Sequence, residues 1–345
     1  MNDTYRIVRD ASLTARNTFK VPARAPMLVE ASESAALPEL LQRSELRDGV
    51  ALVLGGGSNL LFADDADGAV LALTGQRIDL REQHDGVAIV RADAGVEWHG
   101  FVLWTLAQGL AGLENLSLIP GTVGAAPIQN IGAYGVEVRD FIHIVEAYEP
   151  ATGTLHRLAP DACAFAYRDS VFKHAPDRFI VTAVEFALPR NPALKLDYAG
   201  LGDELLAMGI DAPTPRQVSD AVIAIRRRKL PDPAVLGNAG SFFKNPIVPV
   251  AQADALQAMH AALPVFRAGD EARKLSAAWL IDTCGWKGYR DGDAGVAASH
   301  ALVLVNHGHA TGQQLLDLAR RIADSVQVRY GVALEPEPRV IGARW

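Results

Sequence analysis

Two glycine-containing stretches of the sequence could bind a large anionic ligand through their backbone. The first is Gly55-Gly56-Gly57-Ser58-Asn59-Leu60, and the second extends from Gly112 to Gly135. The second stretch has little charge and many leucine, isoleucine and valine residues, so we expect it to run through the interior. A buried irregular backbone needs partners for its N–H groups, and glycines let a ligand approach closely. A diphosphate held by these amides would meet both needs, although tight turns in a compact core would have the same composition.

The first glycine stretch is neither a dinucleotide fingerprint nor a P-loop. The pattern G-x-G-x-x-G requires glycine at position 60, where this sequence has leucine, and no G-K-[ST] is present. Ser58 and Asn59 could still bond a phosphate or a backbone group.

Three other segments hold side chains suited to binding a carboxylate or moving a proton. Arg168, in Y-R-D-S-V-F-K, offers a planar fork of donors that matches a carboxylate. Ser241, in G-N-A-G-S-F-F-K-N-P, lies outside any G-x-S-x-G elbow but could relay a proton. Glu335 and Glu337 alternate onto one face of a C-terminal strand. Each segment alone also fits a structural role: a strand edge with mixed charges, a turn, and a proline-protected sheet edge.

The composition is that of a globular protein, with 345 residues, 49% hydrophobic and 21% charged. A net charge of −7 argues against a broad nucleic-acid surface. The one dense basic run, Arg226–Lys229, fits a helix C-terminus stopped by Pro231. No apolar run approaches the ~20 residues of a membrane span, and Met1–Asp10 lacks a signal core. We therefore expect a cytoplasmic protein without membrane or nucleic-acid partners.

Cysteine usage agrees with this expectation. Cys163 and Cys284 lie far apart, with no C-x-x-C and no metal-ligand spacing. We expect two reduced thiols and no metal site.

Hydrophobic patterning predicts two α/β units with a boundary at residues 231–233. In the first unit we expect a helix over 96–108 and another from Thr214 and Pro215 to Lys229. Strands are expected at 51–54, 69–73, 87–92, 142–148 and 179–188. In the second unit we expect helices over 273–284 and from the Thr311–Gln314 capping box to Gly331, with strands at 301–305 and 332–341.

Taken together and in order, these segments resemble the UDP-N-acetylenolpyruvoylglucosamine reductase family. The resemblance runs from Asn17 to Gly342, and its most specific parts are I-P-G-T-V-G-A-A-P-I-Q-N-I-G-A-Y-G, Y-R-D-S-V-F-K, K-L-P-D-P, G-N-A-G-S-F-F-K-N-P and W-L-I-D. It implies an α+β protein with an FAD-binding fold of the vanillyl-alcohol-oxidase (PCMH) type and a C-terminal α/β substrate-binding lobe. The implied domains are residues 1–75 together with 332–345, then 76–230, and then 231–331.

The resemblance also implies a reaction. The family is expected to bind FAD non-covalently, to take hydride from NADPH, and to reduce the enolpyruvyl ether of UDP-GlcNAc to UDP-N-acetylmuramate for peptidoglycan synthesis. We expect this chain to do so as a monomer in a bacterial cytoplasm.

The residues implied by the resemblance form three sets. The catalytic set is Arg168 as the carboxylate clamp, Ser241 as the proton donor to the carbanion, and Glu337 beside the carboxylate. Pro338 departs from the family pattern and could shift Glu337. The flavin cradle comprises Gly55, Gly56, Gly57, Ser58, Asn59, Leu60, Ile119, Pro120, Gly121, Thr122, Gly124, Ala125, Ala126, Gln129, Asn130, Ile131, Gly132, Ala133, Tyr134 and Gly135. The substrate-binding set comprises Tyr134, Arg168, Tyr198, Lys229, Ser241, Asn245, Lys274 and Glu337, with Tyr198 on the tyrosine loop of one family branch.

Two other functions fit part of this pattern. One is an oxidase of the same flavin fold acting on a sugar or alcohol, but such enzymes often tether flavin to His or Cys, which neither glycine stretch contains. The other is a protein that stores flavin or binds a nucleotide sugar without catalysis, which predicts binding without NADPH oxidation.

Overall fold

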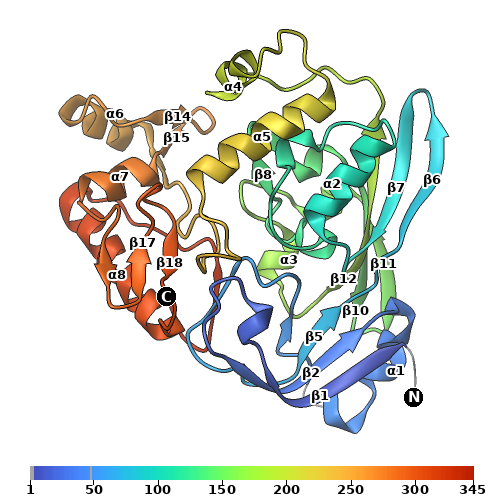
Figure 1. Cartoon of the computed structure of the whole chain (residues 1–345). Coiled ribbons are helices and arrows are strands. Elements are labelled where there is room, and N and C mark those ends of the chain that lie inside the picture. The colour runs from blue at the N-terminus through green and yellow to red at the C-terminus, as the bar shows by residue number, and fades with distance from the viewer. Residues whose placement is uncertain (1–3, 47–48) are drawn as a thin grey trace. The chain divides into compact units, whose positions relative to one another are not determined.

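The protein is described from a computed structural model, which covers residues 4–46 and 49–345 (Figure 1). Its chain forms two compact units. The first comprises the described residues of Met1–Ala11, Ala25–Gly57 and Ala66–Arg227. The second comprises Ser12–Arg24, Ser58–Asp65 and Arg228–Trp345. Residues 1–3 and 47–48 of the predicted first domain lie outside the described residues, and the three predicted domains stay a prediction.

A four-stranded sheet of the first unit leads to the first glycine stretch. Its order is β1-β2-β5-β3, with β1 at Tyr5–Ser12, β2 at Arg24–Ala31, β3 at Leu52–Val53 and β5 at Val70–Leu73. Strands β2 and β3 both pair parallel with β5, so the chain must cross over between them, and α1 (Leu37–Leu41) lies in that connection. The predicted strands at 51–54 and 69–73 are confirmed.

The larger sheet of the first unit separates an apolar core from a charged face. Its order is β11-β10-β12-β7-β6, and its neighbouring strands are antiparallel. The strands are β6 (Ile78–His84), β7 (Val87–Asp93), β10 (Ile142–Glu149), β11 (Thr154–Leu158) and β12 (Ile180–Pro189). Val184 and Phe186 pack in the core with Trp98 and Phe101. Glu185 lies between them in β12 and therefore points to the opposite face.

Two capped helices of this unit adjoin the second glycine stretch. Helix α2 (Trp98–Ala107) follows Glu97, whose carboxylate accepts the N–H groups of His99 and Gly100. Helix α5 (Pro215–Lys229) follows Thr214, which exchanges hydrogen bonds with Gln217 as in a capping box. Both predicted helices are confirmed. Shorter elements of the unit are β8 (Gly132–Ala133), β9 (Val136–Glu137), α3 (Val171–His174) and α4 (Leu201–Ala207).

The second unit contains three small sheets and three helices. The sheets have the orders β13-β15-β14, β16-β17-β18 and β19-β4. Their strands are β4 (Leu60–Phe62), β13 (Ile247–Pro249), β14 (Val265–Arg267), β15 (Ala272–Leu275), β16 (Arg290–Asp291), β17 (Ala294–Val296), β18 (Leu304–Asn306) and β19 (Arg339–Ile341). The helices are α6 (Val250–Met259), α7 (Ala277–Thr283) and α8 (Gly312–Tyr330). The capping box of α8 and its end at left-handed Gly331 are confirmed.

Three predictions for this unit need correction. The helix expected at 273–284 is wrong at its start, because Ala272–Leu275 is the central strand of a sheet and pairs on both sides. Helix α7 begins only after Ser276, whose Oγ accepts the N–H of Trp279 at 3.2 Å. The strand expected at 301–305 is β18, which starts at Leu304. The strand expected at 332–341 is reduced to Arg339–Ile341, since Pro336 and Pro338 have no N–H to donate.

Within the described ranges, no helix is both long and apolar enough to cross a membrane. Among the same residues, no three His, Cys, Asp or Glu side chains cluster in a way that could hold a metal ion. Cys163 and Cys284 are free thiols, as predicted.

Candidate functional site

The two glycine stretches touch each other in the first unit. A Cβ atom on Gly55 would lie 2.8 Å from Thr122 Oγ1, and one on Gly56 would lie 2.8 Å from the Cα of Gly121. Real Cβ atoms do not come this close to other atoms. At position 56 the obstacle is backbone, so only glycine fits there, and at position 55 a larger residue would require the Thr122 side chain to move. Gly55–Gly57 and residues 121–125 therefore form one continuous backbone surface, as a cradle for a large ligand requires.

The second glycine stretch is buried along only part of its length. Leu113, Leu116 and Val123 are fully buried in the core, as predicted. Leu118 and Ile119 are only partly buried, and Pro120 is exposed, so the prediction of a fully internal course is wrong there. Ile128 and Ile131 are likewise partly buried. The accessible part of the stretch includes some residues predicted to contact the cofactor, such as Ile119, Pro120 and Gly121, whereas Gly124, Ala126 and Asn130 are buried.

Arg168 is tied to the end of this stretch by hydrogen bonds from one short segment. Arg168 Nη2 donates to the carbonyl of Gly132 at 2.8 Å, and Ser170 Oγ donates to that of Ile128 at 2.6 Å. In the other direction, Asn130 Nδ2 donates to the carbonyl of Ala166 at 3.0 Å. The predicted carboxylate clamp therefore lies beside this end of the second glycine stretch in the first unit.

Three of these predicted site residues have strained backbones. Asn130, Tyr134 and Arg168 have φ angles of +46°, +50° and +55°, in the left-handed region that favours glycine. Each such residue costs about 1–3 kcal/mol and persists only where surrounding contacts hold it. Three in one small region are typical of a functional site.

Tyr134 and Tyr198, both predicted to bind substrate, are neighbours in the first unit. Their rings meet edge-on with centroids 4.9 Å apart. Tyr134 packs against the buried face of α5, whereas Tyr198 is 47% exposed. An aromatic pair with one exposed member can contact a ligand at the surface of the unit.

The four side chains of the basic run Arg226–Lys229 differ in their exposure to solvent. Arg227, Arg228 and Lys229 are exposed, as expected for the end of a helix. Arg226 is not: its Nε is buried and has no hydrogen-bond partner in the part of the chain that the structure describes. The expectation of an exposed helix end for most of the run is confirmed by the other three residues and does not extend to Arg226.

In the second unit, Ser241 and Glu337 lie on neighbouring backbone segments. The N–H of Glu337 donates to the carbonyl of Phe242 at 2.8 Å, and the N–H of Lys244 donates to that of Glu335 at 3.0 Å. Phe242 is fully buried against Phe19, with ring centroids 6.3 Å apart. The hydroxyl and carboxyl groups predicted to be catalytic are thus carried by paired segments anchored in the core.

The C-terminal end of the first glycine stretch, Asn59 and Leu60, pairs with the segment that carries Glu337. Strand β4 pairs parallel with β19, so Leu60 lies opposite Arg339. Asn59 Nδ2 donates to the carbonyl of Glu337 at 3.3 Å, and the N–H of Arg339 donates to the carbonyl of Asn59 at 3.1 Å. Asn59, predicted for the cofactor, therefore holds the backbone of Glu337, predicted for catalysis.

In another part of the second unit, His300 experiences the charges of two lysines, Lys229 and Lys287. Burial, followed by the positive charges of Lys229 and Lys287, lowers the pKa of His300. The His300 ring also accepts the N–H of Leu302 through Nδ1 at 3.2 Å, so it is held in place. Sequence reasoning selected Lys229 but missed Lys287 and His300, because they are 58 and 71 positions away from it along the chain.

The remaining predicted substrate residues have structural partners. Asn245 Oδ1 accepts the N–H of Ala277 at 3.0 Å and so fixes the start of α7. Lys274 is half-buried on β15, between Ile247 of β13 and Phe266 of β14.

The donor groups found in each unit suit a flavin dinucleotide better than a metal. They are backbone N–H groups, hydroxyls, side-chain amides and guanidinium groups, which suit phosphates and a polar ring edge. Arg168 belongs to the first unit, and Ser241 and Glu337 belong to the second.

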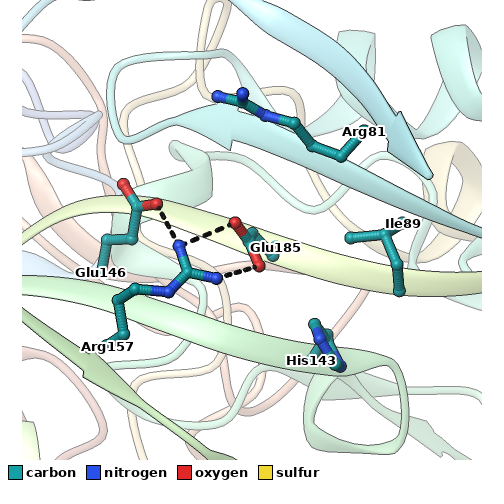
Figure 2. A pocket seen from close by; sticks show the side chains of 6 residues that line it. All are labelled: Arg81, Ile89, His143, Glu146, Arg157 and Glu185. Carbon is teal, nitrogen blue, oxygen red and sulfur yellow. Dashed lines mark hydrogen bonds and ion pairs between the residues drawn. The ribbon is translucent and has the colours of Figure 1, made fainter.

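A hollow of about 260 Å³ lies elsewhere, on the charged face of the large sheet. Figure 2 shows Arg157 between the carboxylates of Glu146 and Glu185, with which it forms ion pairs of 2.9 and 2.8 Å. Hydrogen bonds to Glu185 raise the pKa of Arg157. The hollow contains none of the predicted site residues, and these charges already satisfy one another.

Known proteins resemble the chain over nearly its whole length. An FAD binding domain family matches residues 25–159, and the family of UDP-N-acetylenolpyruvoylglucosamine reductase C-terminal domains matches residues 232–341. A UDP-N-acetylenolpyruvoylglucosamine reductase of Xanthomonas campestris pv. campestris is 57% identical, over 99% of this chain and 98% of the relative. One from Xylella fastidiosa is 56% identical, over 97% and 96%.

Two solved structures are also similar to this chain over most of its length. The crystal structure of UDP-N-acetylenolpyruvylglucosamine reductase (MurB) from Thermus caldophilus is 27% identical, with a TM-score of 0.67 over 98% of each chain. An alkyldihydroxyacetonephosphate synthase shares the fold at 9% identity, with a TM-score of 0.51 over 96% of this chain and 78% of the other.

These findings confirm the predicted α+β fold of the vanillyl-alcohol-oxidase type and the predicted FAD cofactor. They also confirm that the protein is a flavin-dependent oxidoreductase. The chain belongs to the UDP-N-acetylenolpyruvoylglucosamine reductase family.

Proposed function

We propose that this protein reduces UDP-GlcNAc-enolpyruvate to UDP-N-acetylmuramate at the expense of NADPH, in peptidoglycan precursor synthesis. The names of its relatives support the substrate class, and the residues gathered in each unit supply the chemistry. When bound, FAD supplies hydride transfer, first from NADPH and then to the methylene carbon of the enolpyruvyl ether.

Arg168 holds the substrate carboxylate in this proposal. Hydride addition to the methylene carbon leaves negative charge on the adjacent carbon, and this charge spreads into the carboxylate. A guanidinium fork binds a planar oxyanion through two parallel hydrogen bonds, so it stabilises this charge as it develops. The hydrogen bond to Gly132 and the strained backbone of Arg168 fix the side chain for this task.

Ser241 gives its proton to that carbon, and Glu337 lies beside the carboxylate. A hydroxyl is a weak acid, so it needs a fixed position and a means of regaining a proton. The pairing of Phe242 with Glu337 provides the fixed position. This pairing is the single observation that carries the proposal, since it places Ser241, the neighbour of Phe242, on a segment paired with that of Glu337, 96 positions further along the chain.

The substrate diphosphate lies near Lys229 in this proposal, with Lys287 and His300 beside it. An acidic protein needs a local positive patch for such a ligand, and the influence of both lysines on His300 supports one here. The proposed substrate contacts are completed by Tyr134, Tyr198, Asn245 and Lys274.

We further propose three domains with the boundaries given above. We also propose that the protein is a cytoplasmic monomer without nucleic-acid or membrane partners. Light scattering would check the oligomeric state, and cell fractionation would check the location.

The test is anaerobic spectroscopy of the purified protein. We expect a yellow protein whose flavin absorbance bleaches with NADPH and returns with UDP-GlcNAc-enolpyruvate, with UDP-N-acetylmuramate as product. Rapid reoxidation by oxygen together with turnover of an alcohol would instead indicate an oxidase. Binding of FAD and nucleotide sugar without NADPH oxidation would indicate a storage or binding protein.

A further inference from the structure

Asn115 links two segments that are far apart along the chain and that carry predicted substrate residues. Its side chain is fully buried, and its Nδ2 donates to the carbonyls of Tyr134 and Lys195, each at 2.8 Å. These carbonyls lie 19 and 80 positions after Asn115. Tyr198 follows shortly after Lys195, and its ring contacts that of Tyr134. One amide group therefore joins the two segments that carry the tyrosine pair.

The irregular segment at residues 192–197 relies on side chains for its position. It has no regular secondary structure, and no backbone–backbone hydrogen bond joins it to the part of the chain that the structure describes. Leu194 and Leu196 are partly buried against the apolar cluster of α4 and α5, whereas Lys195 between them is exposed. The carbonyl of Lys195 accepts from Asn115 and so anchors this segment to the interior.

Tyr134 needs support at the same point. Its φ angle of +50° lies in the left-handed region, which costs free energy and persists only where surrounding contacts hold it. The hydrogen bond from Asn115 to the Tyr134 carbonyl is one such contact. The backbone of Tyr134 and the segment before Tyr198 are therefore held by the same side chain.

Asn115 is fixed on both sides by buried neighbours. It lies between Glu114 and Leu116 in a short 3-10 turn. The buried carboxylate of Glu114 accepts the N–H of Gly112 at 2.6 Å, and the carbonyl of Leu116 accepts the indole N–H of Trp98 at 2.9 Å. Asn115 is thus a rigid point from which the two segments can be positioned.

Stability alone does not explain an asparagine at this position. The Asn115 Oδ1 is buried and has no hydrogen-bond partner among residues 4–46 and 49–345, and this costs free energy that an apolar side chain would avoid. The Nδ2 group, by contrast, makes two hydrogen bonds. Its two donors are therefore what this side chain contributes.

We propose that Asn115 is a positioning residue for the substrate, because it sets the Tyr198 segment against Tyr134 before the substrate binds. This inference rests on the proposed function, in which both tyrosines contact UDP-GlcNAc-enolpyruvate. A preformed pair of rings avoids the entropy cost of ordering the segment at the moment of binding. Asn115 is buried and acts through the two tyrosine segments.

The first test is limited trypsin digestion of the FAD-bound protein without substrate. Trypsin cleaves the peptide bond whose carbonyl belongs to Lys195, and this carbonyl accepts from Asn115. Asn115→Leu removes both donors and keeps a similar shape, so cleavage after Lys195, identified by mass spectrometry, should be about 10-fold faster. The matched control is Thr105→Val, which removes a buried side-chain hydrogen bond within α2 and should leave this rate unchanged. A wild-type cleavage rate in Asn115→Leu would overturn the proposal.

The second test is a double-mutant cycle on the dissociation constant of UDP-GlcNAc-enolpyruvate, measured with oxidised flavin and without NADPH. We expect Asn115→Leu to weaken binding about 10-fold and Thr105→Val to leave it unchanged. In a Tyr198→Ala background, where the segment no longer carries the ring, Asn115→Leu should weaken binding by less than about threefold. Equal losses in both backgrounds would overturn the proposal, since Asn115 would then act independently of Tyr198.

The remaining outcomes are also decisive. Asn115→Ala carries both measurements if Asn115→Leu does not fold, and failure of both variants to fold would overturn the proposal by showing a role in folding. A wild-type protein that does not bind UDP-GlcNAc-enolpyruvate would overturn the proposed function and the substrate role of Asn115 together. The wild-type measurement alone reveals that case, so it is distinct from a failure of the variants.

Discussion

The backbone N–H of Glu337 donates to the carbonyl of Phe242, so the carboxyl residue and the hydroxyl residue Ser241 occupy paired segments of one unit. Asn59 strengthens this pairing by donating to the carbonyl of Glu337. Phe242 is completely buried, which anchors the segment that carries Ser241. Because the surrounding backbone is fixed in this way, changes to the two side chains should alter chemistry more than structure.

Replacing Ser241 with alanine should separate the two halves of the reaction. The first half needs no proton on carbon, so NADPH should reduce the flavin at nearly the normal rate. Reoxidation by UDP-GlcNAc-enolpyruvate should slow by about 10²- to 10⁴-fold, as expected when a positioned proton donor is lost. Stopped-flow absorbance of the flavin measures each half. A variant that is reoxidised at the wild-type rate would exclude Ser241 as the donor.

Replacing Arg168 with lysine should be damaging even though the charge is kept. Lysine offers a point charge in place of a planar fork, so the paired hydrogen bonds to a carboxylate are lost. We expect kcat/KM for the enolpyruvyl substrate to fall by about 100-fold, or ~2.7 kcal/mol. The affinity for UDP-GlcNAc serves as the control and should not change. Near-normal turnover would mean that charge alone suffices at this position.

Side chains within contiguous motifs were assigned by the family resemblance, and their roles stay a prediction. Arg168, Ser241 and Glu337 each lie in such a motif, and the structure places the latter two on paired segments. The α5 and α8 helices were equally predictable, because Thr214 and Thr311 each begin a capping box.

Features set by contacts distant in sequence could not be predicted. Ala272–Leu275 looks helical but is a strand, because Ile247–Pro249 and Val265–Arg267 pair with it on both sides. Arg226 looks like one more cation at a helix end, and only the packing of α5 shows that it faces inward. For Lys287, the signal that could have helped was the W-L-I-D motif shortly before it.

Replacing Gly56 with alanine should weaken FAD binding. The new Cβ would meet the Cα of Gly121 at 2.8 Å, and backbone at that position can yield only by moving the second glycine stretch. Overpacking of this kind costs about 1–3 kcal/mol. Quenching of FAD fluorescence measures the dissociation constant. The matched control is Gly202→Ala, since a Cβ on Gly202 meets nothing within 4 Å and alanine favours its helix. Equal FAD affinity in both variants would argue against a cradle at Gly56.

His99 makes the conformation of the second glycine stretch sensitive to pH. Its Nδ1 accepts the N–H of Leu118 at 3.0 Å, which requires a neutral ring with the proton on the other nitrogen. Burial lowers the pKa of His99, and Arg227, Arg226 and Arg216 lower it further, whereas Glu97 opposes them. The unfolded chain therefore binds a proton more readily than the folded protein. The contribution of neutral His99 to stability is complete above pH ~6.5. It is lost as the pH falls from there through the pKa of His99 in the folded protein.

Replacing His99 with asparagine should therefore flatten the dependence of stability on pH. The asparagine oxygen can accept the same N–H without gaining a proton. We expect wild type and His99→Asn to melt at similar temperatures at pH 8, and wild type to lose more as the pH falls from 7 to 5. Circular dichroism melts at each pH measure this difference, and His143→Asn, which changes an exposed histidine on the large sheet, is the control. Burial also lowers the pKa of His300 and of His307, but both are present in every variant and so cancel in the comparison. Parallel curves for wild type and His99→Asn would show that protonation of His99 does not disturb the stretch.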